Sequence, residues 1–199
     1  LVQGGHLTAH AGLLEKMVGE LAGLIKADEA HLTHLTLKLA TSILQAVPST
    51  STAVATHLLE PSFGLFHSTV LQGAMLESLV GFFVAASKSG AAALSFASVA
   101  PRLTALGTKF DASAASANTR TFFSCLAHVL AGLVASEPTQ VKPLVTQFVA
   151  DSESSALSTK LLALYSLGEI GRRVDVSTTG CDVKTALLSN LESPIEDAK

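Results

Sequence analysis

Apolar residues recur at helical spacing in segment after segment, and no segment keeps the strict alternation of a half-buried strand for long. The clearest stripe is Leu35, Leu39, Ile43 and Val47, in which each residue stands four positions after the last. Pro48 follows at once, and proline cannot continue a helix because it lacks the amide proton and its ring clashes with the preceding turn. The pattern predicts a helix that buries this stripe and ends before Pro48.

The rest of the chain divides into further helices separated by turns rich in Ser, Thr, Gly and Pro. The hydroxyl groups of residues 49–52 are expected to cap the next helix, because they can accept hydrogen bonds from its free amides. Pro101 removes one amide bond, so we expect its helix to kink or restart there. The expected helices cover residues of about 29–47, 53–66, 70–87, 92–109, 116–135, 139–151, 155–172 and 182–192, and Pro194 opens another.

These helices form pairs at a regular spacing. The first helices begin near positions 29, 70, 116 and 155, a period of about 40 residues that lies in the range of HEAT and armadillo repeats. Such pairs cannot bury their apolar faces alone, so they stack on their neighbours. The sequence therefore predicts an all-α fold, an α-α superhelix of the HEAT/armadillo type with about four to five helical pairs. We expect one continuous solenoid over residues 1–199, with a partial repeat at 1–27, repeats at 28–66, 70–109, 116–151 and 155–192, and the start of another at 194–199.

Composition narrows the possible functions. A net charge of -3 and 13 scattered basic residues argue against a nucleic-acid surface, which needs clustered Lys and Arg. Cys125 and Cys181 form no C-x-x-C pair, so an intracellular, reduced protein is expected. The most apolar stretch, residues 79–97, carries Lys88 at its centre, which would be costly in lipid. Two buried helices joined by a turn explain this stretch better than a membrane span, so no membrane partner is expected.

Two segments resemble a known family. Residues 161–177 read LLALYSLGEIGRRVDVS and are similar to the first helix of a HEAT repeat in the cullin-associated, neddylation-dissociated proteins. Residues 68–83 read STVLQGAMLESLVGFF and resemble the same family about 90 residues upstream, in the correct order. The resemblance extends over residues 28–199, with a weaker match at 88–120. The chain is thereby identified as a fragment of this family.

The resemblance implies a function in protein binding. Members of this family wrap around cullin scaffolds that lack the ubiquitin-like modifier, and they promote the exchange of substrate receptors on cullin-RING ubiquitin ligases. The implied partners are a cullin and its RING subunit, and the implied location is cytoplasmic and nuclear. Another HEAT scaffold, such as a nuclear-transport carrier or a phosphatase scaffold, is the alternative. The family carries histidines where this chain has Arg172 and Arg173, so a fixed positive charge replaces a group that titrates near neutrality.

No candidate catalytic site emerges from the titratable residues. Two histidine pairs, His6 with His10 and His31 with His34, have the spacing to share a helix face, yet neither has a third metal ligand nearby. We therefore expect these histidines to be structural, and we expect no metal, no cofactor and no small-molecule substrate. His57, His67 and His128 are isolated and are expected at the edge of the core or in solvent.

The cysteines and glycines also have structural explanations. Cys125 lies three positions before His128 among apolar residues, which should raise the pKa of its thiol rather than activate it. Cys181 precedes Asp182, whose carboxylate should disfavour the thiolate. Gly168 and Gly171 are expected to let a partner helix pack closely, because a nucleotide-binding loop would have to begin a helix rather than end one.

Two further groups of residues bear on packing and on binding. The Phe pairs 82–83 and 122–123 are expected to fill the core. The partner-binding residues are unknown from the sequence. Charged residues on the second helices are candidates for a concave binding face, namely Lys142, Asp151, Lys184 and Glu192.

Overall fold

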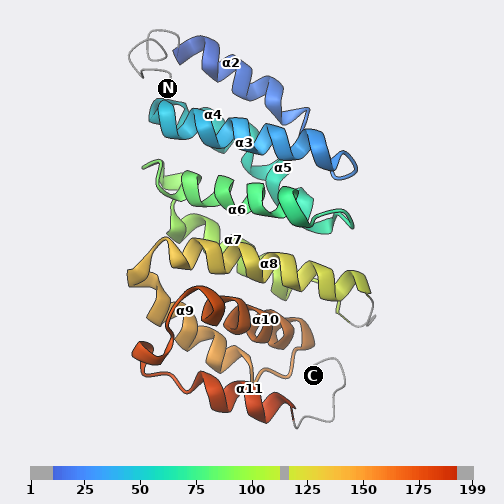
Figure 1. Ribbon diagram of the computed structural model, residues 1–199, viewed down its shortest axis with the longest axis vertical. Coiled ribbons are helices and arrows are strands. Elements are labelled where there is room, and N and C mark those ends of the chain that lie inside the picture. Colours follow the sequence, from blue (N-terminus) through green and yellow to red (C-terminus); the bar gives the residue numbers. More distant parts are fainter. Residues whose placement is uncertain (1–10, 113–116, 192–199) are drawn as a thin grey trace. The chain divides into compact units, whose positions relative to one another are not determined.

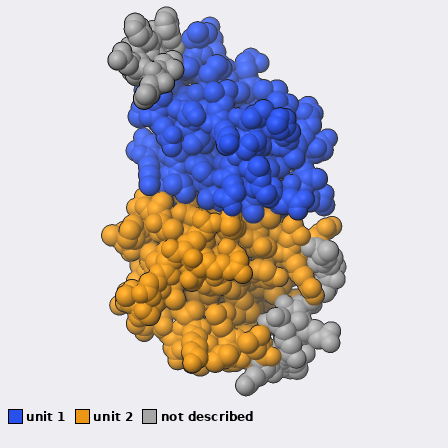
Figure 2. All heavy atoms as spheres, viewed as in Figure 1, with its two compact units in different colours: residues 1–99 blue, residues 100–199 orange. Residues whose placement is uncertain are grey.

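A computed structural model describes residues 11–112 and 117–191, and within these ranges the chain contains helices and no strand. The contacts divide the chain into two compact units, residues 1–99 and residues 100–199 (Figure 2). In each unit, neighbouring helices pack in pairs, as they do in HEAT-type α-α solenoids (Figure 1). The predicted fold class is confirmed. That the repeats form one continuous solenoid stays a prediction.

In the first unit, helices α3 and α6 lie side by side, and α2 packs against α4. Hydrogen bonds join positions about one repeat apart: the Nδ1 atom of His34 lies 2.9 Å from the carbonyl oxygen of Ala74, and Ser68 donates through its hydroxyl to the carbonyl oxygen of Ala27. The elements are α2 (Ala11–Ala22), α3 (Ala30–Ala46), η1 (Pro48–Thr50), α4 (Ser51–His57), α5 (Leu59–Gly64), η2 (Leu65–His67), α6 (Gly73–Ser87) and η3 (Ala92–Leu94).

In the second unit, α10 packs against both α8 and α9, and α11 contacts α9. The elements are α7 (Phe96–Thr108), which begins at the end of the first unit, α8 (Ala117–Ala135), α9 (Pro138–Asp151), α10 (Leu157–Arg173), η4 (Ser177–Thr179) and α11 (Val183–Leu191). Helices α8 to α11 follow one another in the predicted order, and their grouping into repeats at 116–151 and 155–192 stays a prediction. The expected helix start at 194–199 lies outside the described residues.

The buried stripe of α3 differs from the predicted one. Leu35 and Leu39 are 48% and 43% exposed, whereas Ile43 and Val47 are buried as expected. The helix instead buries a stripe one position away, made of Thr33, Thr36, Leu37, Ala40, Ile43 and Leu44. The reason is that α3 has apolar residues on more than one face, so the position of its neighbours, above all α6, selects which face enters the core.

The second helix of the first pair is interrupted, although one helix over residues 53–66 was expected. It is divided between α4 and α5 at Leu58 and ends in the 3-10 turn η2. Pro61 accounts for the break, because its ring conflicts with the carbonyl of His57, four residues earlier, and it has no amide to donate. The expected side-chain cap is also absent at the start of α4: Thr50 donates its hydroxyl to the carbonyl oxygen of Val47, at 2.8 Å, instead of accepting from an amide.

Pro101 does not break its helix. The restart occurs upstream at Ser95, whose extended backbone separates η3 from α7, and α7 then continues through Pro101. Pro101 is exposed, so the carbonyl that loses its intrahelical partner can be satisfied by water. Pro143 lies at the equivalent sixth position of α9 and is tolerated in the same way.

The phenylalanine pairs lie in the cores, as predicted. In the first unit Phe82 and Phe83 are fully buried, and the rings of Phe63 and Phe83 are 5.4 Å apart. In the second unit Phe122 and Phe123 are buried, and the ring of Phe122 stacks on that of Phe110 at 4.0 Å. Aromatic contacts of this kind add to the apolar burial that holds each helix pair together. None of the helices in the described ranges combines the length and apolarity that crossing a membrane requires.

Candidate partner-binding site

A polar network joins α8 and α10 within the second unit. The Nδ1 atom of His128 lies 3.1 Å from Oε2 of Glu169, and Nη2 of Arg173 lies 2.6 Å from Nε2 of the same imidazole. The other carboxylate oxygen of Glu169 accepts a hydrogen bond from Arg172, at 3.1 Å. His128 is half-buried, which agrees with the expectation that it lies at the edge of the core. Arg172 and Arg173 belong to the last turn of α10, where positive charge is favoured by the helix dipole.

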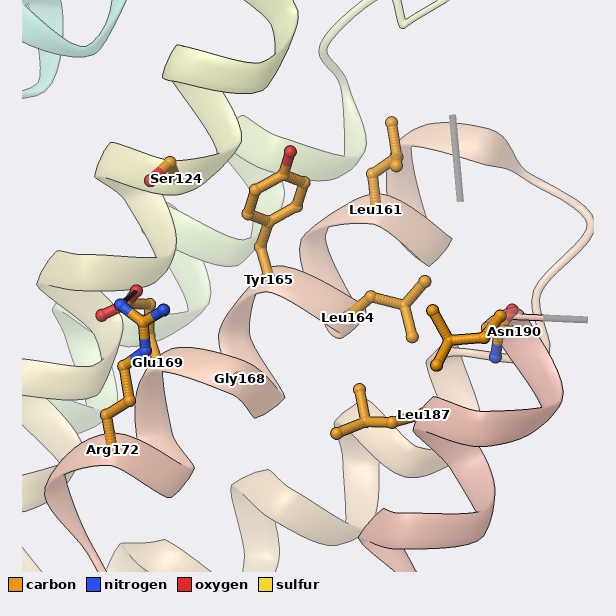
Figure 3. A pocket seen from close by; sticks show the side chains of 10 residues that line it. Ser124, Leu161, Leu164, Tyr165, Gly168, Glu169, Arg172, Leu187 and Asn190 are labelled. Carbon is orange, nitrogen blue, oxygen red and sulfur yellow. Dashed lines mark hydrogen bonds and ion pairs between the residues drawn. The ribbon is translucent and has the colours of Figure 1, made fainter. Parts of the chain in front are cut away.

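A groove lies beside this network. It has a volume of about 420 Å³ and is bordered by α8, α10 and α11 (Figure 3). Leucines of α10 and α11 supply its apolar surface, and Glu169 with Arg172 forms one end. The remaining lining residues are Ser124, Tyr165, Gly168 and Asn190. This arrangement offers an apolar surface with a charged end, which suits a protein segment.

The glycines of α10 do not serve the close packing that was expected of them. A Cβ added at Gly168 or at Gly171 would meet no described atom within 4 Å, and both residues are exposed. A glycine that does permit close packing is Gly107 of α7. A Cβ there would lie 2.8 Å from Leu162 and 2.9 Å from Leu126. Gly107 therefore permits α7 to lie close to Leu126 of α8 and Leu162 of α10, whereas Gly168 faces the open groove.

The histidine pairs have different surroundings. The rings of His31 and His34 are 6.5 Å apart, and Nδ1 of His34 lies 2.7 Å from Oγ of Ser78 on α6. His34 thus has a structural role, as expected, because it connects α3 to α6. His6 and His10 lie outside the described residues. Among the residues that the structure describes, no three His, Cys, Asp or Glu side chains gather as a metal site would require.

The two thiols differ in environment. Burial raises the pKa of Cys125 to about 11, as its apolar surroundings predict. The expectation for Cys181 was wrong, because its pKa is lowered by the hydroxyl of Thr146, then by Thr179, and also by the positive charge of Lys142. Asp182 is not among the causes of this shift, and its own pKa is lowered by the hydrogen bond that its carboxylate accepts from the amide of Thr185, at 2.9 Å.

The charged residues expected on the second helices are accessible where they are described. Lys142 on α9 and Lys184 on α11 are exposed, and Asp151 at the end of α9 is half-buried. Glu192 lies outside the described residues. Whether any of them contacts a partner stays a prediction.

Comparison with known proteins gives the relationships of the chain. It is 27% identical over 191 residues to "Cullin-associated NEDD8-dissociated protein 1" of Arabidopsis thaliana, which covers 93% of the chain and 15% of that protein. The protein of the same name from Drosophila melanogaster is 25% identical over 179 residues, and the match covers 84% of the chain and 14% of that protein. The one from Dictyostelium discoideum is 26% identical over 170 residues, and the match covers 83% of the chain and 13% of that protein. The chain is thus similar, over most of its length, to the cullin-associated NEDD8-dissociated proteins. No protein-family model matches the chain.

The chain spans only about one seventh of the length of these cullin-associated relatives. The sequence indicated the relationship through residues 68–83 and 161–177, which form most of α6 and α10. It did not indicate the groove or the contact of His128 with Glu169. One signal for that contact was present, because the two residues are 41 positions apart, about one repeat.

Proposed function

We propose that the chain is a protein-binding segment of a cullin regulator that promotes the assembly of cullin-RING ubiquitin ligases and the exchange of their substrate receptors. The observation that carries this proposal is the similarity, over 83% to 93% of the chain, to three proteins named as cullin-associated. The helical-pair fold supports it, because stacked pairs provide extended surfaces for partners.

The proposed role is that of a scaffold without catalysis. The relatives are named for association with cullins and not for a reaction. The proposed partners are a cullin and its RING subunit, with no role for nucleic acid, a membrane, a cofactor or a small-molecule substrate. The proposed location is the cytoplasm and the nucleus, which imaging of the tagged protein in cells would test.

The test is a binding measurement with a purified cullin-RING complex in two forms, unmodified and carrying the ubiquitin-like modifier. Binding of the chain to the unmodified form, with at least about tenfold weaker binding to the modified one, is expected, a difference of about 1.4 kcal/mol. Binding to neither form would contradict the proposal. Equal binding to both forms would retain an association with cullins and contradict the preference for the unmodified scaffold.

A further inference from the structure

The groove beside α10 has the dimensions of a helix-binding surface. Its lining on α10 runs from Leu161 to Arg172, which corresponds to about 16 Å along the helix axis, or roughly three turns. Leu161 and Leu164 of α10 line it together with Leu187 and Leu191 of α11, and Figure 3 shows Leu164 on the side toward α11. Leu191 is 54% exposed. Apolar side chains of this size at helical spacing suit the leucine-type side chains of an amphipathic helix.

Gly168 leaves the surface of α10 open within the groove, whereas Gly171, which is equally open, lies outside the groove lining. A glycine inside a helix costs about 0.5 to 1 kcal/mol relative to alanine. No described atom lies within 4 Å of the place where its Cβ would stand, so packing within the described chain does not account for it. Gly168 lies in the lining of the groove, between Leu164 and Arg172 on the same helix. A backbone or a large side chain from outside could therefore approach α10 closely at this point.

The charge at the end of the groove defines the occupant further. The side chain of Arg172 is 78% exposed, so it is available to a partner. The carboxylate of Glu169 already has both oxygens in contact, one with His128 and one with Arg172, and its side chain is only 15% exposed. This end of the groove therefore presents positive charge to a partner, and an acidic side chain complements it.

We propose that the groove between α10 and α11 binds an amphipathic helix of a partner protein, with leucine-type side chains against Leu164 and Leu187 and an acidic side chain beside Arg172. Gly168 provides the point of closest approach. This surface goes beyond the proposed function, because it specifies the chemistry of an interacting segment and does not require that the segment belong to a cullin.

The test uses two substitutions that fit the structure equally well and differ in their place. Gly168→Leu fills the groove, and Gly171→Leu adds the same side chain on α10 outside the groove lining; neither Cβ meets a described atom within 4 Å. The probe is an alanine-based helical peptide of about 18 residues with leucines three and four positions apart and two glutamates one turn beyond them. A matched peptide carries lysines in place of the glutamates.

Affinity is measured by the anisotropy of the labelled peptide, and the place of binding by emission from Tyr165. Tyr165 lines the groove and is the single tyrosine of a chain without tryptophan, so its emission reports on this place alone. We expect the glutamate peptide to bind the unaltered chain with a Kd below about 1 mM and to change the emission of Tyr165. Gly168→Leu should weaken binding at least about tenfold, Gly171→Leu less than about twofold, and Arg172→Gln about threefold.

Several results would overturn the proposal. These are no binding of the glutamate peptide, equal affinity for the glutamate and lysine peptides, or equal effects of the two glycine substitutions. An Ile195→Asp variant that binds the peptide about tenfold more tightly would identify residues 192–199 of the chain as the occupant, and it would equally contradict a partner helix. Because the peptides contain no cullin sequence, the outcome is independent of the cullin-binding test.

Discussion

Nη2 of Arg173 lies 2.6 Å from Nε2 of His128, and the two residues belong to neighbouring helices, α10 and α8. Nδ1 of the same imidazole lies 3.1 Å from Oε2 of Glu169, which also belongs to α10. Nη2 of Arg173 also lies 3.3 Å from Nδ1 of this imidazole. One histidine thus connects two residues of α10 to α8.

The contact between His128 and Glu169 should contribute measurably to stability. Their side chains are 22% and 15% exposed, so water screens the interaction only in part. A double-mutant cycle with His128→Ala and Glu169→Ala should give a coupling free energy of about 0.5 to 1 kcal/mol in urea unfolding. The control pair is Lys26 with Glu29, whose side chains are 50% and 43% exposed and whose coupling should be smaller. A larger coupling in the exposed pair would contradict this account.

The buried face of α3 can be tested by replacing leucines on its two sides. Leu37 is 0% exposed, so Leu37→Ala should lower the free energy of unfolding by about 2 to 5 kcal/mol through lost burial and a cavity. Leu39 is 43% exposed, so Leu39→Ala should lower the free energy of unfolding by less than about 1 kcal/mol. Chemical unfolding followed by circular dichroism gives both values. If both substitutions lowered the free energy of unfolding equally, the buried stripe predicted from the sequence would be supported instead.

Gly107 should be sensitive to the addition of a side chain. A methyl group there would lie 2.8 Å from one Cδ of Leu162 and 2.9 Å from Leu126, so both leucines would have to shift. Gly107→Ala should therefore lower the free energy of unfolding by about 1 to 3 kcal/mol. Gly171→Ala is the matched control on α10, where the added methyl meets no described atom. Gly171→Ala should stabilise the protein by about 0.5 to 1 kcal/mol, because alanine has a higher helix propensity than glycine. Urea unfolding should therefore show a decrease in the free energy of unfolding for Gly107→Ala and an increase for Gly171→Ala.

The two cysteines should react at very different rates with iodoacetamide. The thiolate is the reactive form, and at neutral pH its population rises as the pKa falls. Cys125, with a pKa of about 11 and a buried side chain, should be protected until the protein unfolds, whereas Cys181 should react in the folded state. Thr146→Val removes the first cause of the lowered pKa of Cys181, so it should slow labelling and move the pH dependence of the rate upward. Mass spectrometry of the labelled peptides assigns each site.

A Thr146→Ser variant is the control for that experiment, because it keeps a hydroxyl at the position. It should label at nearly the rate of the unaltered chain. If Thr146→Val and Thr146→Ser were slowed equally, the hydroxyl of Thr146 would not be the cause of the lowered pKa.

The order of the helices and several of their bounds followed from the sequence because their signals are local. Pro48 and Pro138 mark helix boundaries, and the apolar spacing gives the repeat of about 40 residues. The surroundings of Cys125 were equally readable, since apolar residues on its own helix already imply burial. Similarity to the cullin-associated proteins was readable too, because the segments that carry it form parts of α6 and α10.

Tertiary structure decided which faces meet. The sequence placed Leu35 and Leu39 in the core and Gly168 against a helix, but packing depends on neighbours about 40 residues away, and α3 and α10 each offer more than one acceptable face. The lowered pKa of Cys181 was hidden for the same reason, because Thr146 and Lys142 come from another helix. Local periodicity determines that a helix forms and where it ends, whereas its orientation and the electrostatics of its side chains depend on contacts that arise only when the pairs pack.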